Sequence, residues 1–384
     1  MPLRSLHPFR LLRAGIGLAL MGALAVPPAR ALSIQFHDIT PGGMSQNQLD
    51  AFNAAASLWQ SRLFDPVTVY LTISFQNDGN NGILGSTDSS VSNQSYSAVR
   101  SALTTDRTSA LDNTAVSHLQ SGSFLSFQAT NLDLSTRFDN DTNPCLASGA
   151  SVPCATNNQF LAVTTANAKA LGFTTGTSAA NPDGTILFNG NYAGLFDFTR
   201  GDGIDAGSYD FVSIAAHEIG HALGFVSGVD DVDYCSPLAS GRCNGIAGLV
   251  IDNAFSLERR PTYSVLDLFR FSAPGVLDLR VSGRPYFSVD GGDTSIEAFS
   301  NGQINGSDQY QASHFIPGRL NLMNPYGFTG QAVDPSAADL AAFDAIGWDL
   351  VVAVPEPASW VLILAGIAVV GRVTSRRGPS ALRS

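Results

Sequence analysis

The chain has 384 residues, enough to bury a core of ordinary density in one large or two modest domains. Hydrophobic residues make up 44% and charged residues only 14%. So small a fraction of charged residues suits a surface that faces the outside of a cell. Eight of the 21 basic residues lie within residues 1–31 or beyond residue 371, which leaves 13 basic against 31 acidic side chains in residues 32–353. This acidic body argues against nucleic acid and anionic membrane surfaces as partners.

The first 31 residues have the order of features that defines a secretory signal peptide. Arg4, Arg10 and Arg13 form a basic start, and residues 14–26 are an apolar run too short to span a bilayer. Residues 29–31, Ala-Arg-Ala, supply the small-x-small cleavage pattern. We therefore expect export, with residues 32–353 forming the working domain.

Hydrophobic periodicity in residues 32–353 predicts helices and strands in mixed order. Helices are expected at residues 44–63, 165–171, about 210–226 and 335–346, and strands at residues 67–75, 184–189 and 265–271. The stretch between residues 76 and 160 is rich in Ser, Thr, Asn and Asp and gives only weak signals. This order predicts an α+β fold with a mixed sheet.

The helix expected at about 210–226 carries a group of residues suited to metal chemistry. His217 and His221 are four residues apart, so on a helix they lie one turn apart on the same face, where one Zn²⁺ can bind both imidazoles. Glu218 points about 100° away from His217 around the helix, which suits a general base acting on water activated by the ion. The opposite face has apolar residues at steps of three and four, namely Val212, Ala215, Ile219, Ala222 and Val226.

A catalytic zinc ion normally has three protein ligands, so a third must lie elsewhere. In the metzincin pattern His-Glu-x-x-His-x-x-Gly-x-x-His, a glycine turn returns the third histidine to the metal. This chain has Gly224 at the turn, but Ser227 stands where the third histidine would be. Two candidates remain, His314 and Asp230, and we favour His314 because imidazole suits this site and a methionine follows nine residues later.

This arrangement resembles the leishmanolysin-like branch of the metzincins, in which the third histidine lies far along the chain before a methionine turn. The resemblance rests on residues 211–226 and 312–349 and implies a zincin-like catalytic domain. It implies His217, His221 and His314 as ligands, Glu218 as the base, and Met323 as the methionine of the turn.

Three further features of the sequence have weaker patterns. Tyr326 is a candidate donor to a developing oxyanion, with a buried aromatic residue as the alternative. The Asp-rich loops at residues 202–205 and 290–293 are candidate Ca²⁺ sites, with solvated turns as the alternative. The four cysteines form two close pairs, Cys145 with Cys154 and Cys235 with Cys243, which are expected to form local disulfides.

Residues 354–384 form a separate segment at the C-terminal end. The sequence Val-Pro-Glu-Pro at residues 354–357 is followed by an apolar run at residues 358–371, and then by Arg372, Arg376 and Arg377. These three parts in this order resemble the PEP-CTERM sorting signal of Gram-negative bacteria that produce exopolysaccharide. The resemblance implies transient anchoring in the inner membrane, processing by an exosortase, and delivery to the cell surface or extracellular matrix.

The sequence therefore predicts an exported zinc endopeptidase acting on protein or peptide substrates. The expected domain has a less regular C-terminal subdomain at about 227–353, and the substrate is expected beside an edge strand at residues 185–188. Two alternatives remain: a catalytically silent zincin-fold protein of the matrix or of adhesion, and a metal hydrolase of a non-peptide bond in exopolysaccharide.

Overall fold

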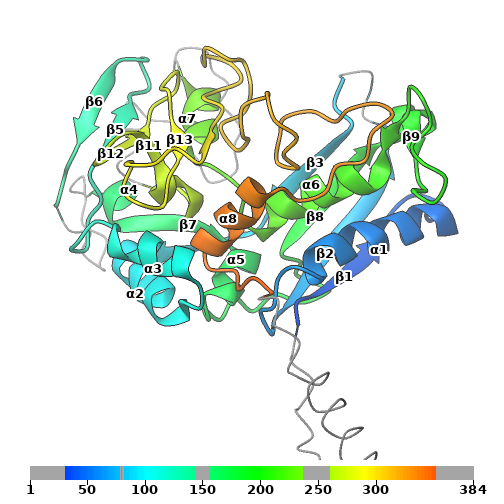
Figure 1. The fold of residues 1–384 in the computed structure, drawn as a ribbon, viewed down its shortest axis with the longest axis horizontal. Coiled ribbons are helices and arrows are strands. Elements are labelled where there is room, and N and C mark those ends of the chain that lie inside the picture. The colour runs from blue at the N-terminus through cyan, green and yellow to red at the C-terminus, as the bar shows by residue number, and fades with distance from the viewer. Residues whose placement is uncertain (1–30, 78, 80–81, 144–154, 237–259, 352–384) are drawn as a thin grey trace, which may run out of the picture.

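The computed structural model describes residues 31–77, 79, 82–143, 155–236 and 260–351. Two larger sheets lie at opposite sides of the molecule in Figure 1, with helices packed beside them. The architecture is thus a mixture of helices and several sheets, as the order of elements predicted.

The first sheet has four strands in the order β1-β2-β8-β3. Its strands are β1 (Ser33–Asp38), β2 (Thr68–Gln76), β8 (Gly184–Asn189) and β3 (Gly85–Ser89). The first three run parallel, and β3 pairs antiparallel with β8. The sheet is therefore mixed, and β3 lies at its edge.

Helices α1 (Gln46–Gln60) and α6 (Phe211–Leu223) lie together on one face of this sheet (Figure 1). A capping box at Ser45 starts α1, because the Ser45 hydroxyl accepts from Gln48 N and the Gln48 side chain accepts from Ser45 N. The buried Trp59 donates from Nε1 to Ala216 O at 2.8 Å, which ties α1 to the backbone of α6. The core of the sheet thus fixes the position of α6.

The second sheet has six strands in the order β14-β13-β11-β12-β5-β6. Its strands are β14 (Glu297–Ala298), β13 (Tyr286–Phe287), β11 (Arg270–Ala273), β12 (Val276–Leu279), β5 (Phe127–Thr130) and β6 (Thr136–Asp139). Strands β5 and β6 precede α6 in the chain, and the other four follow it. The predicted C-terminal subdomain, from about residue 227, therefore shares this sheet with strands from before α6.

Shorter elements connect and cover the two sheets. They are β4 (Val91–Ser95) with β7 (Phe160–Thr164), β9 (Phe196–Asp197) with β10 (Tyr209–Asp210), the helices α2 (Tyr96–Asp106), α3 (Ala110–Ser117), α4 (Thr156–Gln159), α5 (Thr165–Ala170), α7 (Val229–Cys235) and α8 (Ala337–Ala345), and the 3₁₀ helices η1 (Gly190–Leu195) and η4 (Leu266–Phe269). Helix α8 lies between the two sheets in Figure 1, close to the C-terminal end of α6.

Two predictions about strands were wrong. The strand expected at residues 265–271 is mostly the 3₁₀ helix η4, because Asp267 turns inward to accept hydrogen bonds from Ser264 N and Gly228 N. The edge strand expected at residues 185–188 is β8, which is interior, because β3 pairs along its free side. The edge on this side of the sheet is β3, which lies in the polar stretch that gave no clear signal.

Several predicted segments lie outside the described residues. These are residues 1–30 of the predicted signal peptide, the whole C-terminal segment at residues 354–384, and Cys145, Cys154 and Cys243. Cys235, at the end of α7, is disulfide-bonded. Within the described ranges, the search for a helix both long and apolar enough to cross a bilayer found none.

Candidate metal centre

Helix α6 supplies two of the three histidines at the site, and both of its ends are fixed. Asp210 is the N-cap and accepts from Ser213 N at 3.0 Å, while Arg200 pairs with the same carboxylate at 2.5 Å. The helix ends at Gly224, whose φ of 124° favours a residue without a side chain. Of the predicted stripe, Val212, Ala215, Ile219 and Ala222 are buried against the core, so the opposite face presents the histidines. The fifth member, Val226, lies beyond the end of α6 and is partly buried.

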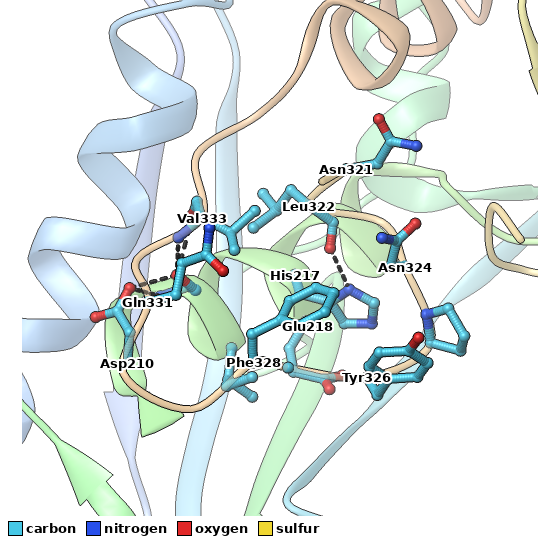
Figure 2. Close-up of a pocket in the computed structure, with 14 residues that line it drawn as sticks. Asp210, His217, Glu218, Asn321, Leu322, Asn324, Tyr326, Phe328, Gln331 and Val333 are labelled. Carbon is cyan, nitrogen blue, oxygen red and sulfur yellow. Dashed lines mark hydrogen bonds between the residues drawn. The ribbon is translucent and has the colours of Figure 1, made fainter. Parts of the chain in front are cut away.

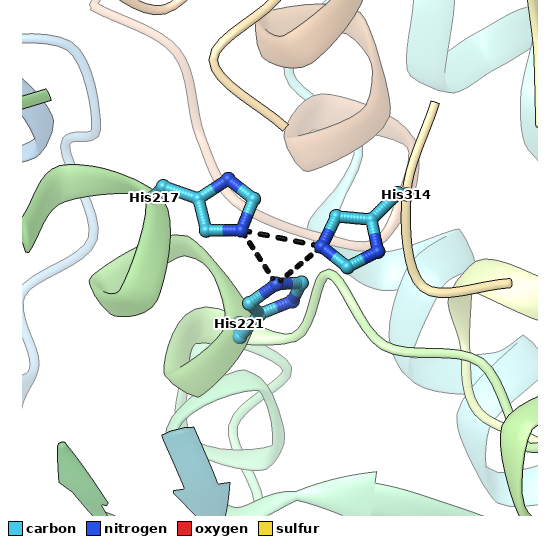
Figure 3. Close-up of side chains that lie close together, drawn as sticks. All are labelled: His217, His221 and His314. Atoms are coloured by element: carbon cyan, nitrogen blue, oxygen red, sulfur yellow. Dashed lines mark hydrogen bonds between the residues drawn. The ribbon is translucent and has the colours of Figure 1, made fainter. Parts of the chain in front are cut away.

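The structure brings His217, His221 and His314 together (Figure 3). The three Nε2 atoms form a triangle, at 3.0 Å between His217 and His221 and at 3.2 Å from each of these to His314. His314 belongs to a loop 93 residues beyond His221, so only the fold places it here.

The second ring nitrogen of each histidine contacts a backbone carbonyl oxygen. His217 Nδ1 lies 2.8 Å from Leu322 O, His221 Nδ1 lies 2.7 Å from Phe225 O, and His314 Nδ1 lies 3.2 Å from Gln311 O. A carbonyl oxygen only accepts, so each Nδ1 carries the proton and each Nε2 keeps a free lone pair. Neutral rings of this tautomer cannot donate to one another through Nε2, and a cation would relieve the repulsion between their lone pairs.

The spacing of these nitrogens fits a tetrahedral ion. Metal–nitrogen bonds of about 2.05 Å at tetrahedral angles would place ligand nitrogens about 3.3 Å apart. The observed separations of 3.0–3.2 Å are close to that value. Burial also lowers the pKa of His221 to about 3 and that of His314 well below its usual range, which keeps both imidazoles neutral. The donor set can hold a metal ion that accepts nitrogen ligands.

The loop containing Met323 packs against α6 next to His217. Met323 is fully buried, and its Sδ lies so close to α6 that a Cβ at Gly220 would approach it to 2.6 Å. Asp339 of α8 holds this loop by accepting from Leu322 N at 2.8 Å and from Met323 N at 3.1 Å. The Leu322 carbonyl that orients His217 is therefore fixed by α8.

Glu218 is held by the edge strand β3. Its Oε2 accepts from the hydroxyl of Thr87 at 2.7 Å, and the same hydroxyl lies 2.9 Å from Glu218 O. A Cβ at Gly85 would lie 3.3 Å from Glu218 Oε1, so the glycine leaves room for the carboxylate. Burial raises the pKa of Glu218, while His217 and the Thr87 hydrogen bond act in the opposite direction.

A pocket opens beside His217 and Glu218 (Figure 2). Its wall is the segment from Asn321 to Phe328, and Ile214 and Val333 add apolar surface. Tyr326 lines this pocket with 45% of its surface exposed, and its ring packs near Tyr310 and Phe328. An exposed phenol at the pocket wall differs from the buried aromatic residue considered as the alternative.

The other predicted metal-binding residues do not join the three histidines. Asp230 instead accepts hydrogen bonds from Ala312 N and Ser313 N, at 2.6 and 2.9 Å. Asp290 accepts hydrogen bonds from Ser288 Oγ and Thr294 N, at 2.7 and 2.8 Å. Its carboxylate thus binds groups of its own turn, which fits the alternative of a turn rather than a Ca²⁺ site. Across the described ranges, the histidine triad is the one group of three or more His, Cys, Asp or Glu side chains close enough to share an ion.

Sequence reasoning missed Thr87, which donates to Glu218, and Asp339, which binds the loop of Leu322 and Met323. Thr87 lies in the strand Gly-Ser-Thr-Asp-Ser, which has no apolar alternation. Asp339 did have a local signal, since Ser336 and Asp339 form a capping box at the start of α8. Its second role, with Leu322 and Met323, depends on tertiary contacts alone.

Comparison with known proteins identifies the end of the chain. The PEP-CTERM protein-sorting motif matches residues 353–377. The chain carries a PEP-CTERM sorting motif. This motif implies export, membrane-associated sorting in a Gram-negative bacterium, and processing by an exosortase at the C-terminus. No curated protein and no solved structure matches this chain.

Proposed function

We propose that this chain is an exported zinc-dependent endopeptidase with a zincin-like catalytic domain. The observation that carries the proposal is the convergence of three Nε2 atoms, with His217 and Glu218 lining the same pocket. The sorting motif supports a role outside the cytoplasm.

His217, His221 and His314 would hold the zinc ion through Nε2. Three imidazoles and an open fourth position are the donor set of a catalytic rather than a structural zinc site. When bound, the ion supplies Lewis acidity that polarises a carbonyl group and acidifies water. The carbonyl partners of the three Nδ1 atoms orient the rings before any ion arrives.

Glu218 is the general base in this proposal. A buried carboxylate with a raised pKa can take the proton of the attacking water and return it to the leaving amine. Thr87 donates to Oε2, which leaves Oε1 for the water. Tyr326 lines the same pocket and is the candidate donor to the developing oxyanion.

The edge strand β3 offers a place for an extended peptide. In the described residues β3 pairs only with β8, so its outer edge has backbone groups available for a further strand. Thr87 lies in β3 and contacts Glu218, so a peptide added to this edge would pass next to the base. This geometry supports a peptide substrate over a polysaccharide.

Hydrolysis of casein or gelatin by the purified exported protein tests the proposal. We expect cleavage that a chelator abolishes and that added zinc restores. Absence of cleavage with a full equivalent of zinc bound would favour a silent matrix protein. Release of product from exopolysaccharide without cleavage of protein would favour the non-peptide hydrolase.

A further inference from the structure

We propose that Asp230 is the positioning residue that holds His314 in the metal centre. The role rests on the proposed function, because it concerns the geometry of the third ligand. Asp230 lies in α7, directly after the turn that ends α6, whereas His314 lies in a loop 84 residues further along the chain.

The Asp230 carboxylate binds the two residues that precede His314. Oδ1 accepts from Ala312 N at 2.6 Å, and Oδ2 accepts from Ser313 N at 2.9 Å and from Ser313 Oγ at 2.5 Å. Three hydrogen bonds to one carboxylate fix both the position and the direction of the backbone entering His314.

Ser227 extends this connection to the end of the catalytic helix. Its backbone N–H donates to Ser313 Oγ at 2.8 Å, and its own hydroxyl donates to Asp267 at 2.5 Å. Ser227 occupies the position at which the metzincin pattern has its third histidine. Here its backbone N–H instead binds Ser313, the residue before His314.

Arg270 holds the carbonyl side of the same segment. This fully buried side chain donates to Ala312 O at 2.9 Å and to Ser300 O at 3.0 Å. Ser300 N in turn donates to His314 O at 2.9 Å. Asp230 thus binds the N–H groups of Ala312 and Ser313, whereas Arg270 binds the carbonyl oxygen of Ala312. Arg270 also holds Ser300, whose N–H donates to the carbonyl oxygen of His314.

His314 depends on this backbone support more than the helical histidines do. Its own Nδ1 contact, to Gln311 O, is 3.2 Å long, compared with 2.8 and 2.7 Å for His217 and His221. The two helical histidines also share the rigid frame of α6, which a loop residue lacks. Loss of Asp230 should therefore free His314 while leaving the other two ligands in place.

The test is the zinc dissociation constant of the full exported chain, measured by competition with a chromophoric chelator. Asp230→Asn places an amide N–H₂ against backbone donors, so we expect zinc affinity to fall about 10- to 100-fold. Asp231→Asn is the matched control, since Asp231 is 57% exposed and pairs with Arg260 at the surface. The control should bind zinc as tightly as the unaltered protein.

A double-mutant cycle separates positioning from general loss of structure. In the His314→Ala background, Asp230→Asn should cost no further affinity, because the residue it positions is gone. An equal loss in both backgrounds, or unchanged affinity of Asp230→Asn, would overturn the role of Asp230 alone. Failure of the unaltered protein to bind zinc would overturn the proposed function as well.

Ser313→Ala covers the case in which Asp230→Asn does not fold. It removes the link between Ser227 and Asp230 but keeps both backbone hydrogen bonds to the carboxylate. We expect a loss of zinc affinity of about tenfold, the lower end of the range for such partners, again only when His314 is present. Affinity equal to that of the unaltered protein would contradict the network.

Discussion

The contact between Thr87 and Glu218 shows how single residues set the chemistry of this site. Glu218 is 6% exposed, so most of its side chain is removed from bulk solvent, and the Thr87 hydroxyl is its hydrogen-bond donor from β3. A hydrogen bond to a charged group contributes about 1.5–3 kcal/mol. Thr87 therefore controls both the orientation and the charge of the proposed base.

Replacing Thr87 with valine keeps the shape of the side chain and removes the donor. We expect kcat to fall about 10- to 100-fold, since each 1.4 kcal/mol corresponds to a factor of ten. Zinc content should not change, because Thr87 does not contact a histidine of the triad. Peptide hydrolysis and bound zinc measured on the same sample check this, with Thr87→Ser as the control that keeps the hydroxyl. Full activity of Thr87→Val would remove Thr87 from the site.

At the residue scale, the sequence predicts partners that are close along the chain. His217 and His221 share a helical face because they are four residues apart, and their local pattern also suggests Glu218. The choice between His314 and Asp230 needs the tertiary structure. It brings His314 to the other two histidines, whereas Asp230 binds the backbone just before His314. Thr87 could not be predicted, because a polar edge strand has no periodic signal.

At the scale of elements, α6 is fixed between α1 and the loop that carries Met323. Gly220 lies at the closest approach, where a Cβ would lie 2.6 Å from Met323 Sδ and 3.2 Å from Trp59. Glycine inside a helix normally costs about 1 kcal/mol relative to alanine. Here the small residue allows α6 to pack directly against Met323.

Gly220→Ala should therefore destabilise the protein, against the usual trend for helices. We expect the free energy of unfolding to fall by about 1–3 kcal/mol, the range for overpacking a filled core. Denaturant unfolding checks this. In a Met323→Ala background the same change should cost less, because the sulfur that it meets is absent. A stabilising Gly220→Ala would contradict the close packing of α6 on Met323.

The elements that sequence predicts best are those with strong apolar periodicity. Helices α1, α6 and α8 and strands β2 and β8 match predicted segments, differing by a few residues at their ends. The region between residues 76 and 160 contains β3, β4, β5, β6, α2, α3 and α4, and the many polar residues there obscure any apolar periodicity. Some of these strands pair with partners far along the chain, as when β5 pairs with β12 and β3 with β8, and local patterns cannot reveal such pairs.

At the scale of the whole molecule, an acidic cluster lies where α2, α3 and α8 meet. Burial raises the pKa of Asp65 to about 8, and the pKa values of Asp106 and Asp344 rise to about 7, with Asp349 adding repulsion to each. The folded protein therefore binds more protons here than the unfolded chain between about pH 4 and pH 8. Stability from this cluster is lost as pH rises through that window.

Replacing Asp106 with asparagine removes one charge without changing the size of the side chain. We expect Asp106→Asn to stabilise the protein by about 1 kcal/mol at pH 8.5 and by much less at pH 5, after discounting for partial exposure. Thermal or denaturant unfolding at the two pH values measures the difference. Equal effects at both pH values would show that Asp106 is ionised across the range. Asp50→Asn, on the exposed face of α1, is the control for loss of charge.

The acidic body, the histidine triad and the sorting motif are the three features on which we base the proposal of an enzyme that works outside the cytoplasm. The most direct test compares the unaltered protein with Glu218→Gln at equal zinc content, using hydrolysis of casein as the readout. Glutamine keeps the shape of the residue but cannot accept the proton of the attacking water. The proposed function predicts that both proteins bind one zinc ion and that only the unaltered one cleaves. Cleavage that survives Glu218→Gln would contradict it.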